Sequence, residues 1–376
     1  MVQCQGMRWR SWRRWAYGAL LLLLLAPMAF LAIGCAFDGP AYRGPVSGHF
    51  DGTVFRNPEP VPDKTLWDVM AWRASSTAAR ETPVVSVVPA VPARRVDGDR
   101  LVATWVGHAT VLLQGGGLNV LTDPVWADRA SPVAFAGPKR YAAPGIRFAD
   151  LPPIDLVLVT HNHYDHCDLD TLARLHREHG ARIVVPLGVD LLLAERGIPS
   201  AAVLDWWDAT TLAGATVAAV PARHFSARGI SDRNRTLWCG YVLDLPGAGR
   251  VYMAGDTGMG AHFAEVGARY PGSRLALLPV GAHLPRYFMA AVHTDPAEAV
   301  AALGAVGAQA GLGIHWNTFP MADDGPADTR RELEAALAAR GPGAPLRLLA
   351  HGEAWDLGPA DPRIPGPASA AVIIPP

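Results

Sequence analysis

The chain has 376 residues, of which 50% are hydrophobic and 18% are charged, and its formal net charge is −1. This composition is typical of a globular protein and excludes a disordered or fibrous chain. The near-neutral charge argues against nucleic acid as a partner, because nucleic-acid-binding domains are usually basic. The length allows one large domain or two small ones, and either can bury a sizeable core.

The first 35 residues resemble an export signal. They hold four arginines and no acidic residue, so the rest of the chain has a net charge of −5. The arginines precede the apolar run Ala19–Ile33, which is short for a membrane span and has the length of a signal-peptide core. The run leads to Gly34 and Cys35, a pair similar to a bacterial lipoprotein cleavage site, although Ala32 stands where such sites usually have leucine.

Three outcomes for residues 1–35 remain open: lipid attachment at Cys35, an uncleaved membrane anchor, and simple secretion. Each of them places the body of the protein outside the cytoplasm, attached to a membrane or near one. The sequence therefore predicts an exported protein that is anchored at the cell envelope.

Residues 36–98 are expected to be a tether that carries one short amphipathic helix. Residues 36–64 are rich in glycine and proline, which favours an irregular tether or a segment draped over the domain. Thr65 and Asp68 form a capping-box pattern, so a helix should follow from Leu66 to about Ala74. This helix either packs on the core or, because it carries two tryptophans, faces a membrane or an acyl chain.

The remainder of the chain, residues 99–376, alternates between short β-branched runs and Ala/Leu-rich stretches. Strands are expected at Leu101–Val106, Thr110–Gln114, Leu118–Leu121, Leu156–Thr160, Ile183–Val185, Val217–Val220, Tyr241–Leu245, Val251–Ala254, Leu275–Val280 and Arg347–Ala350. Helices are expected at Leu169–His179, Val189–Arg196, Pro296–Leu303 and Asp328–Ala339. Early hairpins followed by alternating strands and helices favour a layered α/β sandwich over a doubly wound sheet.

Four potential metal ligands follow one apolar strand within six residues. His161 and His163 are two positions apart, so an extended strand end directs both imidazoles to the same side. Asp165 and His166 follow where the chain must turn, and their side chains can bind a second ion nearby. Imidazole and carboxylate are usual ligands for zinc and also suit iron or manganese. A chance cluster in a solvated loop is a poor alternative, because the chain has only 13 histidines.

Three later residues are candidates for the remaining ligands of two ions. His224, Asp256 and His315 each come just after an apolar run that is expected to be a strand. Glycines on both sides of Asp256 allow the backbone to approach the site closely. Taken together with the first cluster, these residues predict a dinuclear metal site.

The order His161, His163, Asp165, His166, His224, Asp256, His315 resembles the signature of the metallo-β-lactamase superfamily. The resemblance covers roughly residues 100–353 and implies an α/β (α+β) fold, a four-layer αββα sandwich. Further segments look like the branch that contains N-acylphosphatidylethanolamine-hydrolysing phospholipase D. They are Trp105–Thr110, Thr122–Trp126, Gly137–Arg140, Ala254–Gly258, Pro285–Met289, His293–Pro296 and His351–Glu353.

This resemblance implies two zinc ions and assigns the ligands. His161, His163 and His224 would hold one ion, Asp165, His166 and His315 would hold the other, and Asp256 would bridge them. His293 matches a histidine that is important for activity in that branch. The catalytic residues expected on this basis are Asp165, Asp256 and His293.

Other residues are expected to support the site. His108 and Asp123 are candidates for orienting the metal ligands. Tyr164 and Arg286 are candidate substrate contacts, although a structural ion pair is an equally good role for Arg286. Cys167 and Cys239 are expected to pack in the core, with a single bridge left open, and Cys167 is assigned no catalytic role.

The expected reaction is hydrolysis of a phosphodiester by a hydroxide shared between the two ions. The expected substrate is N-acylphosphatidylethanolamine or a related amphiphilic lipid at a membrane surface. A lactonase, or another ester or amide hydrolase on the same metal core, is the alternative. His283 departs from the phospholipase branch, which has an aromatic residue at this position. The resemblance therefore supports the expected reaction type more strongly than it supports the expected substrate.

Overall fold

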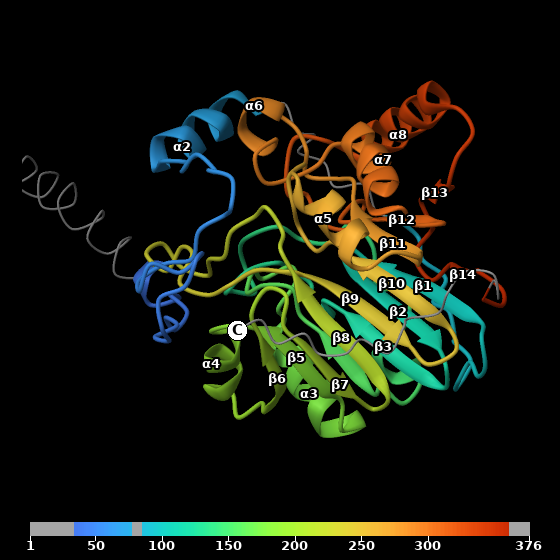
Figure 1. Ribbon diagram of the computed structural model, residues 1–376. Coiled ribbons are helices and arrows are strands. Elements are labelled where there is room, and N and C mark those ends of the chain that lie inside the picture. The colour runs from blue at the N-terminus through green and yellow to red at the C-terminus, as the bar shows by residue number, and fades with distance from the viewer. Residues whose placement is uncertain (1–33, 77–84, 361–376) are drawn as a thin grey trace, which may run out of the picture.

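Two seven-stranded sheets form the centre of the computed structural model, which describes residues 34–76 and 85–360 (Figure 1). The first sheet has the order β14-β1-β2-β3-β4-β5-β6, with β1 at Leu101–Gly107, β2 at Thr110–Gly115, β3 at Leu118–Thr122, β4 at Leu156–Leu158, β5 at Arg182–Pro186, β6 at Ser200–Leu204 and β14 at Ala354–Asp356. The second has the order β13-β12-β11-β10-β9-β8-β7, with β7 at Ala209–Leu212, β8 at Ala215–Val220, β9 at Gly240–Leu245, β10 at Gly249–Met253, β11 at Ser273–Pro279, β12 at Gly311–Ile314 and β13 at Leu346–Arg347.

Helices cover the outer faces of both sheets. The helices α3 (Leu169–His179) and α4 (Val189–Ala194) lie on the first sheet, and α5 (His262–Arg269), α7 (Pro296–Val306) and α8 (Pro326–Arg340) lie on the second (Figure 1). Two further helices, α2 (Leu66–Ser75) and α6 (Arg286–Met289), lie side by side at one end, and a short 3-10 turn occupies Phe148–Asp150. This arrangement confirms the predicted four-layer αββα sandwich.

The sequence of the strand β4 is apolar at every position because both of its faces are buried. Leu156 and Leu158 are fully buried in the core between the two sheets. Val157 and Val159 are fully buried on the opposite face, in a second core under α3 and α4. Because both faces of the strand are covered, alternation with polar residues is absent here, as in other buried parallel strands.

The strand directions bring several loops together at one edge of the sandwich. The strands β3 to β6 run parallel to one another, as do β10 to β13. The strand β8 is antiparallel to β9, which is antiparallel to β10, so β8 and β10 end at the same edge. The chain segments that follow β3, β4, β8, β10 and β12 therefore meet there, as is usual for functional loops of α/β sheets.

Every predicted strand and helix of residues 66–350 has a counterpart; α3 has the predicted bounds, and most of the others have shifted ends. The strand β4 stops two residues earlier than predicted, because the chain leaves the sheet before His161. Only Arg347 of the predicted strand Arg347–Ala350 is in β13. The strands β6, β7 and β14 and the helices α5 and α6 were not predicted. The helix α5 has no side-chain cap at its N-terminus, and α6 is a single turn, so neither carries a clear start signal.

Much of the glycine- and proline-rich segment lies against the sandwich. Phe50 and Phe55 are buried in the main core. The amide of Phe55 donates a hydrogen bond to the carbonyl of Asn234 (2.8 Å). The side chain of Asn57 donates to the backbone carbonyl of His224 (2.8 Å). Residues near position 55 therefore contact the loop that carries one of the predicted ligands.

The predicted signal lies almost entirely in residues 1–33, which are outside the described residues. Within the part that is described, no helix has the length and hydrophobicity needed to cross a membrane. Cys35 is exposed, whereas Cys167 and Cys239 are both buried and free. The two buried cysteines thus form no bridge and have the packing role that was expected of them.

Candidate metal centre

The predicted ligands converge at the edge of the sandwich where the strands end. His161 and His163 come from the loop after β4, His224 from the loop after β8, and His315 from the position directly after β12. His161, His224 and His315 are almost fully buried. The sheet topology therefore brings together ligands from loops that are far apart in the sequence.

Three imidazoles form the first group. The Nε2 atom of His161 lies 2.8 Å from Nδ1 of His163. The Nε2 atom of His224 lies 3.4 Å from the same Nδ1 atom. The three nitrogens can therefore reach one metal ion.

Asp165, His166 and His315 form the second group, together with His108. The Nε2 atoms of His166 and His315 lie 3.4 and 3.3 Å from Oδ2 of Asp165. Asp256 lies between the two groups, since its Oδ2 atom is 3.0 Å from His315 Nε2 and 3.7 Å from His224 Nε2. This is the position that a bridging carboxylate needs.

The hydrogen bonding of the site fits a metal ion. Nε2 of His166, Nε2 of His315 and Oδ1 of Asp256 are buried and have no hydrogen-bond partner among the described residues. Buried polar atoms in native proteins almost always have a partner, so these three need an explanation. A cation between the carboxylate and the imidazoles would supply the missing interaction, and these residues can therefore hold metal.

The protonation of the site also suits cation binding. Burial lowers the pKa of His161 and of His224 well below the usual value, so both are neutral imidazoles with a lone pair free for a ligand bond. Burial alone would raise the pKa of Asp165 and of Asp256, but the neighbouring histidines, above all His166 and His315, together outweigh it and keep both carboxyls ionised. Neutral imidazole and carboxylate are the forms that bind divalent metals.

Asp123 orients two of the ligands. This fully buried carboxylate accepts hydrogen bonds from the amide and the hydroxyl of Thr160 (2.7 and 2.8 Å) and from Nδ1 of His166 (2.8 Å). The hydroxyl oxygen of Thr160 is 2.9 Å from Nδ1 of His161. Because Thr160 donates its proton to Asp123, it can accept one from His161. Asp123 has the orienting position that was predicted, and Thr160 was missed although it immediately precedes His161.

His108 orients a third ligand. Its Nε2 atom lies 2.8 Å from Oδ2 of Asp165. Burial lowers the pKa of His108 to about 3, so the ring is neutral and can donate this hydrogen bond from Nε2. The φ angles of His108, Asp123 and His315 are 55°, 34° and 60°, in the left-handed region that non-glycine residues rarely adopt. Such strain is typical of functional sites that the surrounding fold holds in place.

Gly255 explains how Asp256 reaches the site. Its φ angle is 64°, and a Cβ atom here would lie 2.9 Å from a methyl group of Thr160 and 3.0 Å from the carbonyl oxygen of Cys239. Any other residue would push the loop after β10 away from the loop after β4. The glycine before Asp256 is thus required by close packing, as its place in the sequence indicated.

A cleft of about 250 Å³ opens onto the metal-binding groups. Its lining includes Tyr164 and His293, which were predicted as a substrate contact and a catalytic residue. Apolar residues that were not predicted also line it: Ala130, Phe225, Ala282, Met289 and Met321. No sequence motif marks them, because they come from five separate loops and helices.

Arg286 is not brought to the cleft. Its guanidinium donates to a carboxylate oxygen of Glu298 (2.7 Å) and to the backbone carbonyl of His293 (3.0 Å), and it lies 3.3 Å from Asp295. Of the two roles expected for Arg286, the structure thus shows the ion pair, which ties α6 to the start of α7.

His283, the residue that departs from the phospholipase branch, is buried beside the site. Its Nε2 atom lies 2.7 Å from Glu332 and its Nδ1 atom 3.4 Å from Asp324. Burial favours the neutral ring, but Asp324 and Glu332 outweigh burial and raise the pKa of His283 above its ordinary 6.5. Protonated His283 therefore stabilises the folded state.

A His283→Gln substitution should lower the free energy of unfolding most at pH values below 6.5, where the unfolded chain is also protonated and the full stabilisation is present. The loss should shrink as the pH rises through the folded-state pKa, because the parent then loses its proton. Urea denaturation at several pH values measures the difference, with His176→Gln on α3 as the control. A loss that does not change with pH would contradict the charged role of His283.

Comparison with known proteins agrees with this geometry. A family model described as a beta-lactamase superfamily domain matches residues 118–316. An uncharacterized protein of Mycobacterium tuberculosis is 39% identical over 282 residues, which cover 74% of this chain and 73% of that protein. The N-acyl-phosphatidylethanolamine-hydrolyzing phospholipase D 1 of Caenorhabditis elegans is 40% identical over 232 residues, which cover 59% of this chain and just under two thirds (65%) of that enzyme.

Among solved structures, a metallo hydrolase of the archaeon Ignicoccus hospitalis has a TM-score of 0.51 at 24% identity, and the match covers 68% of this chain and 98% of that one. This likeness concerns the fold alone. Together, the family model, the relatives and the histidine and aspartate groups show that the chain belongs to the metallo-β-lactamase superfamily of metal-dependent hydrolases.

Proposed function

We propose that the protein is a dinuclear zinc phosphodiesterase of the phospholipase D type, which hydrolyses N-acylphosphatidylethanolamine or a related lipid. The similarity to the Caenorhabditis elegans enzyme at 40% identity carries this proposal. The arrangement of the ligands and the apolar cleft support it.

Seven residues would hold the two ions. His161, His163 and His224 would bind one ion, and Asp165, His166 and His315 the other, with Asp256 between them. When bound, two such ions lower the pKa of water to about 7 and polarise the phosphoryl oxygen of a substrate. Asp123 and His108 keep the ligands in place through the hydrogen bonds described above.

The proposed reaction breaks the bond between phosphorus and the ethanolamine oxygen. The hydroxyl group of water goes to phosphorus, and the leaving oxygen takes up a proton, which yields phosphatidic acid and an N-acylethanolamine. His293 lies at the cleft with its ring centre 5.2 Å from those of both His224 and His315. Burial lowers the pKa of His293 to about 4, so the ring is neutral at pH 7 and can accept a proton or hydrogen-bond to a phosphate oxygen.

The lining of the cleft favours an amphiphilic substrate whose only charge lies at the group that meets the metal-binding residues. Apart from the histidines and aspartates of the centre, the described residues that line it are tyrosine, phenylalanine, methionine and alanine, and none is lysine or arginine. A substrate with further free anionic groups would find no side-chain cation there. A phosphodiester flanked by acyl chains would place its one charge on the metal ions and its chains on the apolar walls.

The helices α2 and α6 connect this cleft to the protein surface. Trp72 of α2 stacks on Phe288 of α6 with 5.0 Å between the ring centres, and its indole N–H donates to Asp323 (3.0 Å). Trp72 also shares a small hydrophobic cluster with Met289 and Ala282, which line the cleft. The packing of α2 therefore supports the apolar wall of the cleft.

The outer side of the same two helices is apolar and exposed. Trp67 and Met70 of α2 are 77% and 51% exposed, and Tyr287 of α6 is 70% exposed. Large exposed aromatic side chains suit the interface of a membrane, where the ring can enter the lipid while its N–H or O–H group stays in water. We infer that this surface, here called the α2–α6 surface, lies on the membrane that holds the substrate.

The proposed place of action is the outer side of a membrane. The charged and apolar pattern of residues 1–35 is the support for export, and the exposed position of Cys35 leaves its thiol accessible to a lipid. An anchor at this point would keep the α2–α6 surface close to its substrate.

The metal-stripped protein should bind two equivalents of zinc, and His161→Ala and His315→Ala should each bind one tightly. Each substitution removes a ligand from a different ion, so the remaining ion keeps its own set. Titration against a chromophoric chelator measures how many equivalents of zinc the parent and each variant bind, with His176→Ala as the control. Two tight equivalents in either variant, or fewer than two in the parent, would contradict a dinuclear centre.

The zinc-loaded protein should hydrolyse N-acylphosphatidylethanolamine, and His161→Ala or chelation should lower the rate by at least about 10³-fold, because the nucleophile is generated at the metal centre. The assay compares this lipid with a panel of lactones and measures kcat/KM for each. Turnover of a lactone while the phospholipid is untouched would favour the ester or amide hydrolase alternative. Full turnover by metal-free protein would contradict any metal mechanism.

A triple substitution of Trp67, Met70 and Tyr287 by serine should lower the rate on lipid in vesicles by about 10-fold or more, because buried apolar area drives interfacial binding. The rate on a short-chain, monomeric phosphodiester should stay unchanged, because none of the three residues lines the cleft. The control is Val88→Ser with Val91→Ser, because these two side chains are also largely exposed and lie outside α2 and α6. Equal rates of the parent and the triple variant on vesicles would contradict the membrane role of the α2–α6 surface.

A further inference from the structure

Three ligand histidines have a hydrogen-bond partner on the ring nitrogen that faces away from the metal centre. Nδ1 of His161 is 2.9 Å from the hydroxyl of Thr160, and Nδ1 of His166 is 2.8 Å from the carboxylate of Asp123. Nδ1 of His224 is 3.0 Å from the carbonyl oxygen of Val292. Such partners fix the tautomer and the ring plane of a ligand, and metal-binding histidines almost always have one.

His315 differs from these three. Its Nε2 atom faces the centre, 3.0 Å from Asp256 and 3.3 Å from Asp165. Its Nδ1 atom is buried and has no hydrogen-bond partner among the described residues. Since His315 is only 2% exposed, bulk solvent cannot supply the partner. An unsatisfied nitrogen on a ligand would cost stability and leave the tautomer unspecified.

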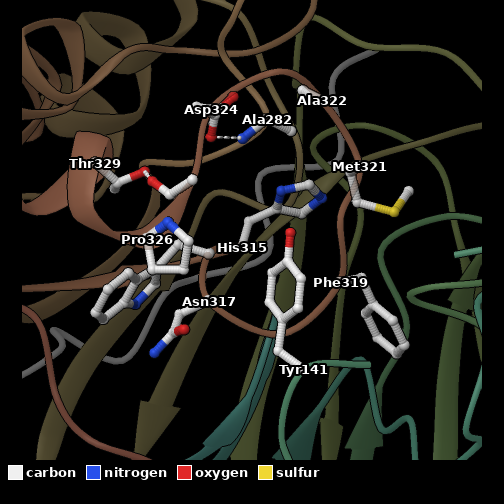
Figure 2. Close-up of a pocket in the computed structure, with 12 residues that line it drawn as sticks. Tyr141, Ala282, His315, Asn317, Phe319, Met321, Ala322, Asp324, Pro326 and Thr329 are labelled. Carbon is white, nitrogen blue, oxygen red and sulfur yellow. Dashed lines mark hydrogen bonds between the residues drawn. The ribbon is translucent and has the colours of Figure 1, made fainter. Parts of the chain in front are cut away.

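A small polar cavity lies directly beside His315. Its volume is about 10 Å³, close to what one water molecule needs. Tyr141, Asp324 and Thr329 line it together with His315 (Figure 2). In Figure 2 the hydroxyl of Tyr141 points toward the imidazole of His315, and the carboxylate of Asp324 lies beyond the ring in this view.

Both polar neighbours are held in place. The carboxylate of Asp324 accepts hydrogen bonds from the amides of Ala282 (2.9 Å), His283 (2.8 Å) and Leu284 (3.0 Å). The amide of Tyr141 donates to the carbonyl oxygen of Thr318 (2.7 Å), three residues after His315. The cavity therefore has rigid polar walls, which is the condition under which a buried water becomes part of a structure.

We propose that one water molecule occupies this cavity and links Nδ1 of His315 to the hydroxyl of Tyr141 and the carboxylate of Asp324. The water accepts hydrogen bonds from the imidazole N–H and from the phenol, and it donates one to the carboxylate. Three hydrogen bonds are typical of a buried water. The link keeps the proton of His315 on Nδ1 and leaves the lone pair of Nε2 for the metal ion.

Tyr141 and Asp324 are thus positioning residues for the second metal ion. Tyr141 comes from the loop after β3 and Asp324 from the segment before α8, so two distant parts of the chain act on one ligand. The inference rests on the proposed metal-binding role of His315 and does not depend on the identity of the substrate.

Tyr141→Phe tests this link, because it removes only the hydroxyl. Loss of such an indirect partner typically lowers metal affinity 10–100-fold. We expect a loss of this size for one of the two ions and no change for the other. Titration of the metal-free protein with Co²⁺, followed by visible absorption, resolves the two ions and reports changes in ligand geometry. Tyr287→Phe, on the exposed side of α6, is the matched control.

Crystals of the metal-loaded parent protein provide a second test that does not depend on a variant. The proposal predicts a water within hydrogen-bond distance of Tyr141 Oη and His315 Nδ1. Unchanged affinity and absorption in Tyr141→Phe, or a cavity without water in the parent, would overturn it. Failure of lipid hydrolysis would leave both readouts unaffected, so the two proposals can fail separately.

Discussion

The geometry of the metal centre depends on the burial of one carboxylate, Asp123. A carboxylate without solvent contact is very costly unless hydrogen bonds compensate it, and the three that do so come from the amide and the hydroxyl of Thr160 and from Nδ1 of His166. The chain after β4 must therefore leave the sheet where Thr160 reaches Asp123. This constraint sets the direction of His161 and His166 at once, and it explains why β4 ends before the apolar run of its sequence does.

The remaining ligands meet this pair because of the sheet topology and the charge balance. The strands β8, β10 and β12 end at the same edge, and Gly255 lets the loop that carries Asp256 approach Thr160 closely. Burying Asp165 and Asp256 is unfavourable unless positive charge joins them. Burial alone would lower the pKa of His166 and of His315, but these carboxylates raise the first well above its usual value and the second to about 9, so that a proton holds the place that a metal cation would take. The atoms without partners on His166, His315 and Asp256 lie where such a cation would bind. Six buried polar atoms without a partner among the described residues belong to His108, His166, Asp256, His293 and His315, at or beside the candidate centre.

The sequence allowed the fold class, most strands and helices, and all seven proposed ligands to be predicted, because each ligand follows an apolar run and the spacing of the first four is distinctive. It did not reveal Thr160 as the link between Asp123 and His161, since hydroxyl direction depends on tertiary structure. It did not reveal the walls of the cleft, because Phe225, Met289 and Met321 come from separate segments. The sequence left two roles open for Arg286, and only the folded chain shows that Asp295 and Glu298 engage its guanidinium.

The apolar cleft and the adjoining α2–α6 surface are the features that favour the proposed lipid substrate, whereas the metal-binding groups alone would serve an ester or amide hydrolase equally well. The bond that is broken separates these functions. Hydrolysis of N-acylphosphatidylethanolamine in ¹⁸O-labelled water, with both products analysed by mass spectrometry, identifies the atom that water attacks. The account predicts one ¹⁸O atom in the phosphate of phosphatidic acid and none in the N-acylethanolamine. Label in the carboxylate of a released fatty acid, with the phosphodiester intact, would contradict it.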